Sequence, residues 1–512
     1  MFYVEIEALN ETYIRINSNN EAIFEVLFDT FSFEVPSARF MKSHIRNGGS
    51  WDGFIRLFNY RERTIPKGLG KEIVKILKSA DYGEVRFVGF EKKPDISDDF
   101  EDIYQEIYDQ IQGTDNPFDP YDFQIETVKK ACQNQRNLII SPTSSGKSLM
   151  IYIWYRFVRT VLQEDEKILI IVPSITLVDQ LFDDFKSYGY TGDAHLIVGG
   201  SAKDADCNLY ISTWQSLQKL QPKWFRKFKG VAVDEVHGAA AASLKGSVEK
   251  CINATFRAGF TGTLNELETD ELVLRGLFGD VLVATTYQEM RERGIIPDVE
   301  IELVRVKYGE NFKDLIKASH NEFSQEMAFV QSNKQRDEVL LNILRENSGL
   351  NGIFLFREIK HLKRIEELFR KNTNQTIAVI NGAVDRNTRA EIRKSIDANA
   401  AKGIRGCIIL ATYGTMSTGV SIKNLDYGVF AAPMKSKIKV LQSLGRLLRK
   451  SSSKFYAKLY DVWDDFLPHV KEDNFGKKHA KSRLRFYQEA GFRLVERAVS
   501  VGDTERVQGL DC

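Results

Sequence analysis

Residues 137–150, N-L-I-I-S-P-T-S-S-G-K-S-L-M, contain the residue types that bind nucleotide phosphates. The apolar run 138–140 predicts a buried strand, and the Gly-Lys-Ser that follows opens an apolar helical stretch. Backbone N–H groups at a helix start face an anion, and the helix dipole favours negative charge there. We therefore predict that the phosphates of ATP are bound by Ser145, Gly146, Lys147 and Ser148.

Two side chains of this loop have distinct expected roles. Lys147 supplies a mobile positive charge to the β- and γ-phosphates, and Ser148 gives its hydroxyl to Mg²⁺. Ser141 stands where the common loop pattern has glycine. A chance Gly-Lys-Ser in a turn is the alternative interpretation of this stretch taken alone.

Residues 231–237, V-A-V-D-E-V-H, place two acids at the end of a buried apolar strand. Carboxylates in such a position are costly unless they meet a cation. We expect Asp234 to complete the Mg²⁺ shell and Glu235 to orient and deprotonate the attacking water. His237 is placed to sense whether nucleotide is bound. The alternative is a strand that merely ends in acidic surface residues.

Two weaker patterns flank these motifs. In Y-D-F-Q, Tyr121 offers a ring to stack on adenine and Gln124 an amide to bind the edge of the base. In F-T-G-T-L, Thr261 and Thr263 belong to a small-residue turn that is suited to linking the nucleotide site to movement.

The segment 441–449, L-Q-S-L-G-R-L-L-R, supplies cations late in the chain. On a helix, Gln442, Arg446 and Arg449 lie three or four residues apart and therefore share one face. Two arginines on one face stabilise the charge on transferring phosphoryl oxygens, so we assign Arg446 and Arg449 as fingers and Gln442 to ATP binding.

Near the N-terminus, residues 40–70 interleave basic and aromatic side chains. Cations bind phosphates and rings stack on bases, so this stretch indicates a nucleic-acid surface with Arg46, Trp51 and Arg56 as candidates. An equally good interpretation is a half-buried sheet whose aromatic residues are core and whose cations are solvated. The basic stretch 477–497 resembles a surface helix, for which a solvated face is the favoured interpretation.

Composition limits the possibilities further. The chain has 512 residues, 43% hydrophobic and 28% charged, with a net charge of +1, as is ordinary for a soluble protein of about three domains. Five scattered cysteines without a C-x-x-C pair argue against a disulfide framework or a zinc site. We find no secretory signal and no apolar run of membrane-spanning length. We therefore expect a cytoplasmic protein, monomeric in solution, with no membrane partner.

Apolar strands alternate with helical patterns twice along the chain, which is typical of parallel sheets covered on both faces. The predicted fold class is α/β, with two tandem parallel-sheet domains behind a small α+β N-terminal domain. The predicted divisions are an N-terminal nucleic-acid-binding domain at 1–92, an acidic linker at 93–119, an ATP-binding domain at 120–297, a connecting segment at 298–335 and a second domain at 336–512.

The ordered motifs resemble those of superfamily-2 helicases of the DExH type. P-T-S-S-G-K-S, D-E-V-H, F-T-G-T-L and Q-S-L-G-R-L-L-R are similar to motifs I, II, III and VI, and the resemblance covers roughly residues 121–463. It implies two RecA-like domains that close on ATP and Mg²⁺. It also implies contacts to the nucleic-acid strand along which such a motor moves. The residues at these positions are Pro173, Ser174, Thr213, Gln215, Thr412, Ser417 and Thr418. Ser421 stands where many relatives have aspartate.

More closely, the whole chain resembles a family of phage recombination and repair helicases, through segments such as G-S-W-D-G-F-I-R-L-F-N-Y and K-S-K-I-K-V-L-Q-S-L-G-R. This resemblance implies a 3′→5′ motor on single-stranded, forked and four-way-junction DNA, displacement loops and RNA–DNA hybrids, in the host cytoplasm. The alternatives are an RNA helicase, a restriction-system motor subunit, or a non-catalytic DNA-binding or annealing protein with a silent ATP site.

Overall fold

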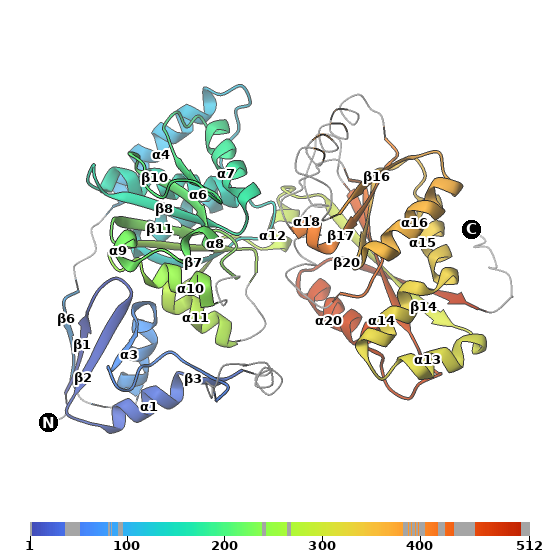
Figure 1. Cartoon of the computed structure of the whole chain (residues 1–512). Helices are drawn as coiled ribbons and strands as arrows, with labels where there is room; N and C mark the ends of the chain where they lie inside the picture. The colour runs from blue at the N-terminus through green and yellow to red at the C-terminus, as the bar shows by residue number, and fades with distance from the viewer. Residues whose placement is uncertain are drawn as a thin grey trace. The chain divides into compact units, whose positions relative to one another are not determined.

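The computed structural model describes residues 3–35, 52–79, 82, 84–90, 96–237, 242–263, 268–381, 405–417, 425–434 and 456–502, with isolated positions at 388, 391, 395 and 398. The chain forms two compact units (Figure 1). The first contains residues 1–141 and 146–285, and the second contains residues 142–145 and 286–512.

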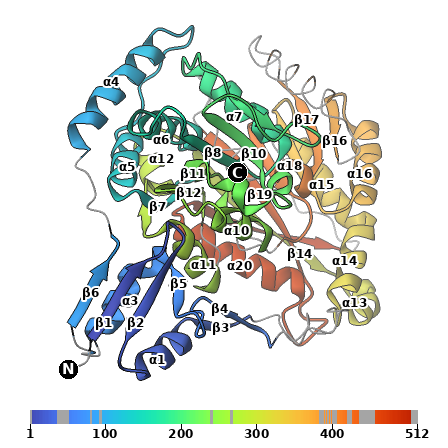
Figure 2. The ribbon, with the colours of Figure 1, turned by 60° about the vertical axis from the view of Figure 1, so that its left-hand side comes forward.

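The first unit begins with a small α+β domain. Its mixed sheet has the order β5 (Thr64–Pro66), β2 (Tyr13–Ser18), β1 (Tyr3–Ala8) and β6 (Glu84–Val88). Helices α1 (Ala22–Thr30) and α3 (Gly70–Ser79) pack on this sheet, as Figure 2 shows, and alternate strand residues such as Val4, Ile6 and Ile14 form the shared core. A separate two-stranded ribbon joins β3 (Ser32–Glu34) to β4 (Phe54–Arg56). The expected α+β class of this domain is confirmed.

This domain contacts the rest of the first unit closely. A Cβ added at Gly68 would lie 2.0 Å from the carbonyl oxygen of Arg275, so only glycine fits there. Nearby, Arg136 donates to the Glu11 carboxylate at 3.0 Å. Buried Arg257 donates to the Thr12 hydroxyl at 2.8 Å. These contacts attach the turn between β1 and β2 to the larger sheet of the first unit, because Arg136 and Arg257 lie near the starts of two of its strands.

That sheet has seven parallel strands in the described part of the chain. Their order is β13 (Val281–Val283), β7 (Arg136–Ile140), β12 (Phe256–Thr261), β11 (Phe228–Val233), β8 (Lys167–Val172), β10 (Leu209–Thr213) and β9 (His195–Ile197). The continuous apolar runs of the sequence occur here because both faces are covered.

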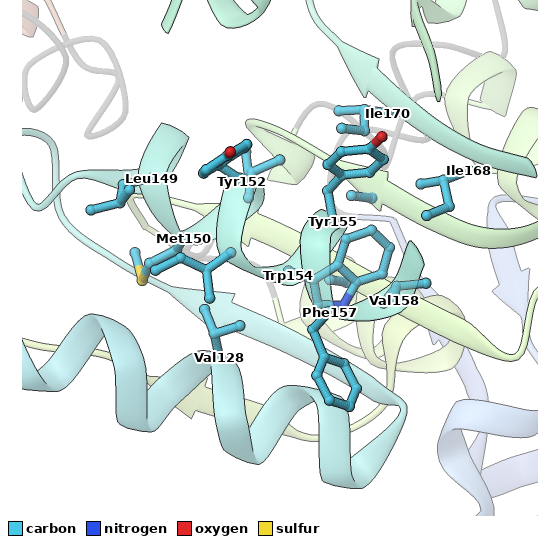
Figure 3. Close-up of a cluster of buried hydrophobic side chains, with 14 of the residues drawn as sticks. Val128, Leu149, Met150, Tyr152, Trp154, Tyr155, Phe157, Val158, Ile168 and Ile170 are labelled. Atoms are coloured by element: carbon cyan, nitrogen blue, oxygen red, sulfur yellow. The ribbon is translucent and has the colours of Figure 1, made fainter. Parts of the chain in front are cut away.

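Helices cover both faces of this sheet. One face carries α4 (Ser97–Gln112), α5 (Asp122–Asn134), α6 (Lys147–Val161) and α7 (Ile175–Ser187), and the other carries α8 (Trp214–Leu217), α9 (Pro222–Phe225), α10 (Ala242–Glu249) and α11 (Glu268–Phe278). Figure 3 shows Trp154, Phe157 and Val158 of α6 among the buried side chains beneath the sheet. This packing fixes the helix that begins at the phosphate loop.

The acidic stretch before α5 contributes to this core. It contains helix α4, and Phe100, Ile107 and Ile111 of that helix are buried against the cluster around α6. Three buried residues at helical spacing on a polar helix are the mark of an amphipathic helix that packs on the domain. The domain limits drawn from the sequence remain a prediction.

The second unit contains another sheet of seven parallel strands among the described residues. Their order is β16 (Thr376–Ile380), β17 (Cys407–Thr412), β15 (Gly352–Phe356), β18 (Tyr427–Phe430), β19 (Tyr456–Asp465), β14 (Asp298–Tyr308) and β20 (Arg493–Val501). Two all-parallel sheets covered by helices confirm the predicted α/β class with tandem RecA-like domains.

The continuous helices described in the second unit are α12 (Tyr287–Glu292), α13 (Lys313–Ser319), α14 (Phe323–Ser332), α15 (Lys334–Glu346), α16 (Ile359–Asn372), α18 (Tyr413–Ser417) and α20 (Phe475–Glu489). The polar stretch before residue 336, which the sequence suggested as a connection, includes the long strand β14 and two helices. The basic C-terminal stretch is α20 followed by β20 rather than helix throughout. Among the described residues, none of the helices has the length and apolar character that a membrane crossing requires.

Candidate active site

The order of the strands places the sequence motifs of the first unit along one sheet edge. Because β7, β12, β11, β8 and β10 are neighbours and parallel, the loops that follow them all lie at their carboxyl ends. The phosphate loop follows β7, Thr261 ends β12 and Asp234 follows β11, while Pro173 follows β8 and Thr213 ends β10. The predicted ATP-binding residues therefore occupy one part of the sheet edge. The residues predicted to contact a nucleic-acid strand occupy the adjoining part.

Gly146 is required by the geometry at the start of α6. Its φ of +83° is left-handed, a conformation that L side chains rarely adopt, and an added Cβ would lie 2.2 Å from Nε2 of Gln124. Gln124 is buried, and its Oε1 accepts a hydrogen bond of 2.8 Å from the Tyr121 N–H. The Tyr121 ring is partly exposed and stacks on Phe123. The predicted adenine-binding pair thus lies beside the phosphate loop.

Lys147 joins the phosphate loop to the acidic motif. Its Nζ lies 3.7 Å from Oε1 of Glu235 and donates to the carbonyl oxygen of Ser141 at 3.3 Å. The Ser141 N–H donates in turn to the carbonyl oxygen of Thr261 at 2.8 Å. Ser141 stands where the common loop pattern has glycine, but both of these contacts are made by its main-chain atoms. They therefore do not depend on the side chain at position 141.

The two acids after β11 occupy different electrostatic environments. Burial, together with the adjacent Glu235 carboxylate, raises the pKa of Asp234 well above its usual range. For Glu235 burial alone would raise the pKa, but Lys147 and His237 outweigh it and the pKa falls, so this side chain is ionised as a base must be. Glu235 has a φ of +51°, and a non-glycine residue held there costs about 1–3 kcal/mol.

His237 connects these acids to the turn after β12. Its Nδ1 lies 3.3 Å from Oε2 of Glu235 and 3.1 Å from Oγ1 of Thr261. The Thr261 hydroxyl donates to the carbonyl oxygen of Thr263 at 2.7 Å. Side chains that the sequence grouped as catalytic or coupling residues therefore form one continuous chain of contacts across three strands.

The donor set around Asp234 suits Mg²⁺. Burial and then the neighbouring Glu235 carboxylate raise the pKa of Asp234, so a cation beside it would be favourable, and Lys147 lies within ion-pair distance of Glu235. Hard oxygen donors are the ligands that Mg²⁺ prefers, and Asp234 and the Ser148 hydroxyl provide them. Among the described residues no group of three or more metal-binding side chains gathers.

Tyr188 is a residue near this site that the motifs did not identify. It directly follows α7, and its side chain lies near that of Ser148. Burial raises the pKa of Tyr188, so its phenol remains protonated. No local pattern could reveal this contact because Tyr188 lies 40 residues after Ser148 in the chain.

The residues of the first unit that are predicted to contact a nucleic-acid strand lie at the starts of helices. Ser174 is the N-cap of α7 and follows Pro173, and Thr213 is the N-cap of α8, with its hydroxyl 3.1 Å from that of Ser216. Gln215 is exposed, whereas Thr213 is almost fully buried. The Thr213 side chain is therefore less accessible to a nucleic acid than the neighbouring glutamine.

In the second unit, Thr412 ends β17, and its hydroxyl lies 2.7 Å from that of Thr415. Ser417 ends helix α18. The remaining predicted residues lie outside the described part of the chain, namely Arg46, Trp51, Thr418, Ser421, Gln442, Arg446 and Arg449. Their assignments remain predictions.

The N-terminal candidate Arg56 lies in an aromatic cluster. Its guanidinium lies 5.4 Å from the ring centroid of Phe28 and 5.3 Å from that of Phe54, and it pairs with Asp52. Phe54 is exposed, whereas Phe58 is buried in the domain core. Some aromatic side chains of this stretch are therefore core and others accompany an exposed cation, and the nucleic-acid contact stays a prediction.

Parallel sheets in tandem, with a phosphate loop and an acidic motif at one sheet edge, are typical of motors driven by nucleotide hydrolysis. Comparisons with known proteins agree. The family described as "DNA helicase UvsW, N-terminal" matches residues 4–86, and "Type III restriction enzyme, res subunit" matches residues 117–266. The ATP-dependent DNA helicase uvsW of Enterobacteria phage T4 is 30% identical over 508 residues, covering 96% of this chain and 98% of that protein.

Two solved structures are also similar. The crystal structure of T4 UvsW is 28% identical, covers 97% of this chain and 99% of that chain, and gives a TM-score of 0.49. The Type ISP restriction-modification enzyme LlaBIII bound to DNA has a TM-score of 0.58 at 15% identity, covering 86% of this chain and 37% of that one. The second likeness concerns the fold alone.

The chain belongs to the UvsW family of superfamily-2 helicases. Membership of this family supports an ATP-dependent helicase activity.

Proposed function

We propose that this protein is a DNA-stimulated ATPase that remodels branched DNA. Its reactions would be branch migration of four-way junctions, fork regression, and unwinding of displacement loops and RNA–DNA hybrids during recombination, repair and replication. The observation that carries the proposal is the chain of contacts from Lys147 through Glu235 and His237 to Thr261, because it joins three motor motifs at one sheet edge.

The residues divide the work of hydrolysis as follows. Lys147 binds the terminal phosphates, and ionised Glu235 orients the attacking water and accepts its proton. Asp234 and Ser148 would hold Mg²⁺, which neutralises charge on the phosphate oxygens when bound. Arg446 and Arg449 would stabilise the phosphoryl group in the transition state.

The remaining chemistry concerns the DNA. The segments after β8 and β10 would bind backbone phosphates, which carry no sequence information, so we expect selection of DNA by structure rather than by sequence. The resemblance of the N-terminal domain to the UvsW N-terminal family, and the exposed Arg56 cluster, support a second DNA contact there. Polarity of 3′→5′ and a monomeric state are part of the same proposal.

The decisive experiment is steady-state ATP hydrolysis with single-stranded DNA, forked DNA, a four-way junction and single-stranded RNA, with Lys147→Ala as the blank. The greatest stimulation by branched DNA would support the proposal. Stimulation by RNA alone would favour an RNA helicase. An absence of turnover on every substrate would favour a binding protein with a silent ATP site.

A further inference from the structure

The N-terminal domain and helix α11 of the first unit share part of one hydrophobic core. Val273 of α11 is buried among the apolar side chains of the N-terminal domain, and the neighbouring Leu272 packs against the same cluster. Domains that meet through small polar interfaces usually move relative to each other, whereas an apolar contact opposes such motion. The N-terminal domain is therefore attached to the first unit by more than the connecting chain.

The closest packing in this contact is between main-chain segments. A Cβ added at Gly68 would lie 2.0 Å from the carbonyl oxygen of Arg275 and 2.6 Å from that of Gly276. A Cβ added at Gly276 would in turn lie 3.0 Å from Cβ of Pro66. Main-chain atoms cannot move aside as the end of a flexible side chain can. The turn that contains Gly68 therefore lies directly on the backbone of α11.

Buried polar contacts surround this packing. The Thr12 hydroxyl accepts a hydrogen bond from Arg257 at 2.8 Å and donates to the Glu249 carbonyl oxygen at 3.0 Å. The Tyr13 hydroxyl donates to the Glu249 carboxylate at 3.0 Å. Thr12 and Arg257 are each only 1% exposed, so a tilt of the domain that admitted no water would leave their polar groups unpaired.

Two ion pairs lie at the rim of the contact. Glu72 of α3 pairs with Arg275 of α11, and both side chains are largely buried. Lys71, which is exposed, pairs with Asp280 just beyond α11. Opposite charges facing each other fix the orientation of a contact, because a rotation would separate them or bring like charges together. Apolar, steric and charged contacts together therefore define both the position and the angle of the N-terminal domain.

We propose that this contact holds two DNA-binding surfaces at a fixed separation and angle, and that the fixed geometry selects branched over single-stranded DNA. One surface is the exposed cluster around Arg56 on the N-terminal domain, and the other includes Ser174 and Gln215 after strands of the larger sheet. Both surfaces belong to the first unit. The inference rests on the proposed function, since it requires a DNA contact at each place.

The physical reason is bivalent binding. Two contacts on one rigid body bind a DNA of matching shape more tightly than either contact alone, and the gain depends on the geometry that joins them. A single strand that occupies one surface gains nothing from the second. Gly68 and Arg275 are therefore positioning residues for the choice of substrate.

The first test is Gly68→Ala, with Gly70→Ala as the matched control. Each variant adds one carbon to the same segment, but the nearest atom to a Cβ at Gly70 is Cδ1 of Ile14 at 3.9 Å, and the backbone there is already helical. We expect Gly68→Ala to weaken binding of a four-way junction at least about tenfold, measured by fluorescence anisotropy without nucleotide. Binding of single-stranded DNA should change less than about twofold, and Gly70→Ala should match the wild type on both DNAs.

The ion pair at the rim provides a second test that leaves the close packing intact. Glu72→Arg places two guanidinium groups against each other and should also lower the preference for the junction. The double variant Glu72→Arg/Arg275→Glu exchanges the two charges and restores the net charge of the wild type. We expect it to recover the preference.

The ratio of the two DNA affinities separates positioning from a loss of stability, because an unfolded fraction weakens binding of both DNAs equally. A lower preference for the junction in Gly68→Ala and Glu72→Arg, with recovery in the double variant, supports the inference. An unchanged ratio in both single variants, or an equal loss on both DNAs, overturns it. If the wild type itself does not prefer the junction, the proposed action on branched DNA fails, whereas a preference that survives in both variants refutes only this inference.

Discussion

Replacing Gly146 by alanine tests whether the left-handed turn and the close contact with Gln124 shape the phosphate loop. An L side chain at a φ of +83° costs about 1–2 kcal/mol. The new Cβ would also push away the Gln124 amide and break its buried hydrogen bond to Tyr121, which contributes about 0.5–1.5 kcal/mol. We therefore expect Gly146→Ala to lower the free energy of unfolding by about 1.5–3.5 kcal/mol in total.

Gly200 provides a matched control in the same unit. It has the same φ of +83°, but nothing lies within 4 Å of the position of its Cβ. Gly200→Ala should therefore show the conformational cost alone, and the difference between the two variants should measure the contact with Gln124.

The assay is urea-induced unfolding without nucleotide, in a double-mutant cycle of Gly146→Ala with Gln124→Ala. In the Gln124→Ala background the cost of Gly146→Ala should fall to that of Gly200→Ala, which gives a coupling energy of about 0.5–1.5 kcal/mol. An equal cost of Gly146→Ala in both backgrounds would refute the reasoning that the two residues are in steric contact.

Four further predictions concern the motor and the N-terminal domain. Glu235→Gln should lower kcat for ATP hydrolysis about 10²–10⁴-fold while nucleotide affinity, measured by titration calorimetry, is retained; unchanged turnover would remove Glu235 as the base. Thr261→Val keeps the branched shape but loses the hydroxyl beside His237, so junction-stimulated turnover should fall about fivefold, with Thr263→Val, which leaves that hydroxyl in place, as the comparison. Binding of single-stranded DNA, followed by fluorescence anisotropy, should weaken at least about tenfold between 50 and 200 mM NaCl, and a flat salt dependence would contradict phosphate tracking. Arg56→Gln should reduce the salt slope for the four-way junction, and an identical slope would return the N-terminal cluster to a structural role.

Local sequence was sufficient to predict the strand, turn and helix start of the phosphate loop and the class of fold. A phosphate loop consists of a strand, a turn and a helix start that are contiguous in the chain, so all its determinants lie within 137–150. The strands 167–172, 352–356 and 376–380 coincide with apolar runs in the sequence, because a strand that is covered on both faces is apolar along its length.

Only the tertiary structure decided which charged residues are buried. The C-terminal basic stretch was interpreted as a solvated face, yet Arg483 within it is nearly inaccessible and paired with Asp461 on a strand 22 residues earlier. Arg257 and Arg336 are likewise buried; Arg257 donates to nearby carbonyl groups and to Thr12, 245 residues away, and Arg336 pairs with Asp464, 128 residues away. A charged side chain is stable inside a protein only when distant segments bring it a partner, and spacing along the chain does not record which segments meet.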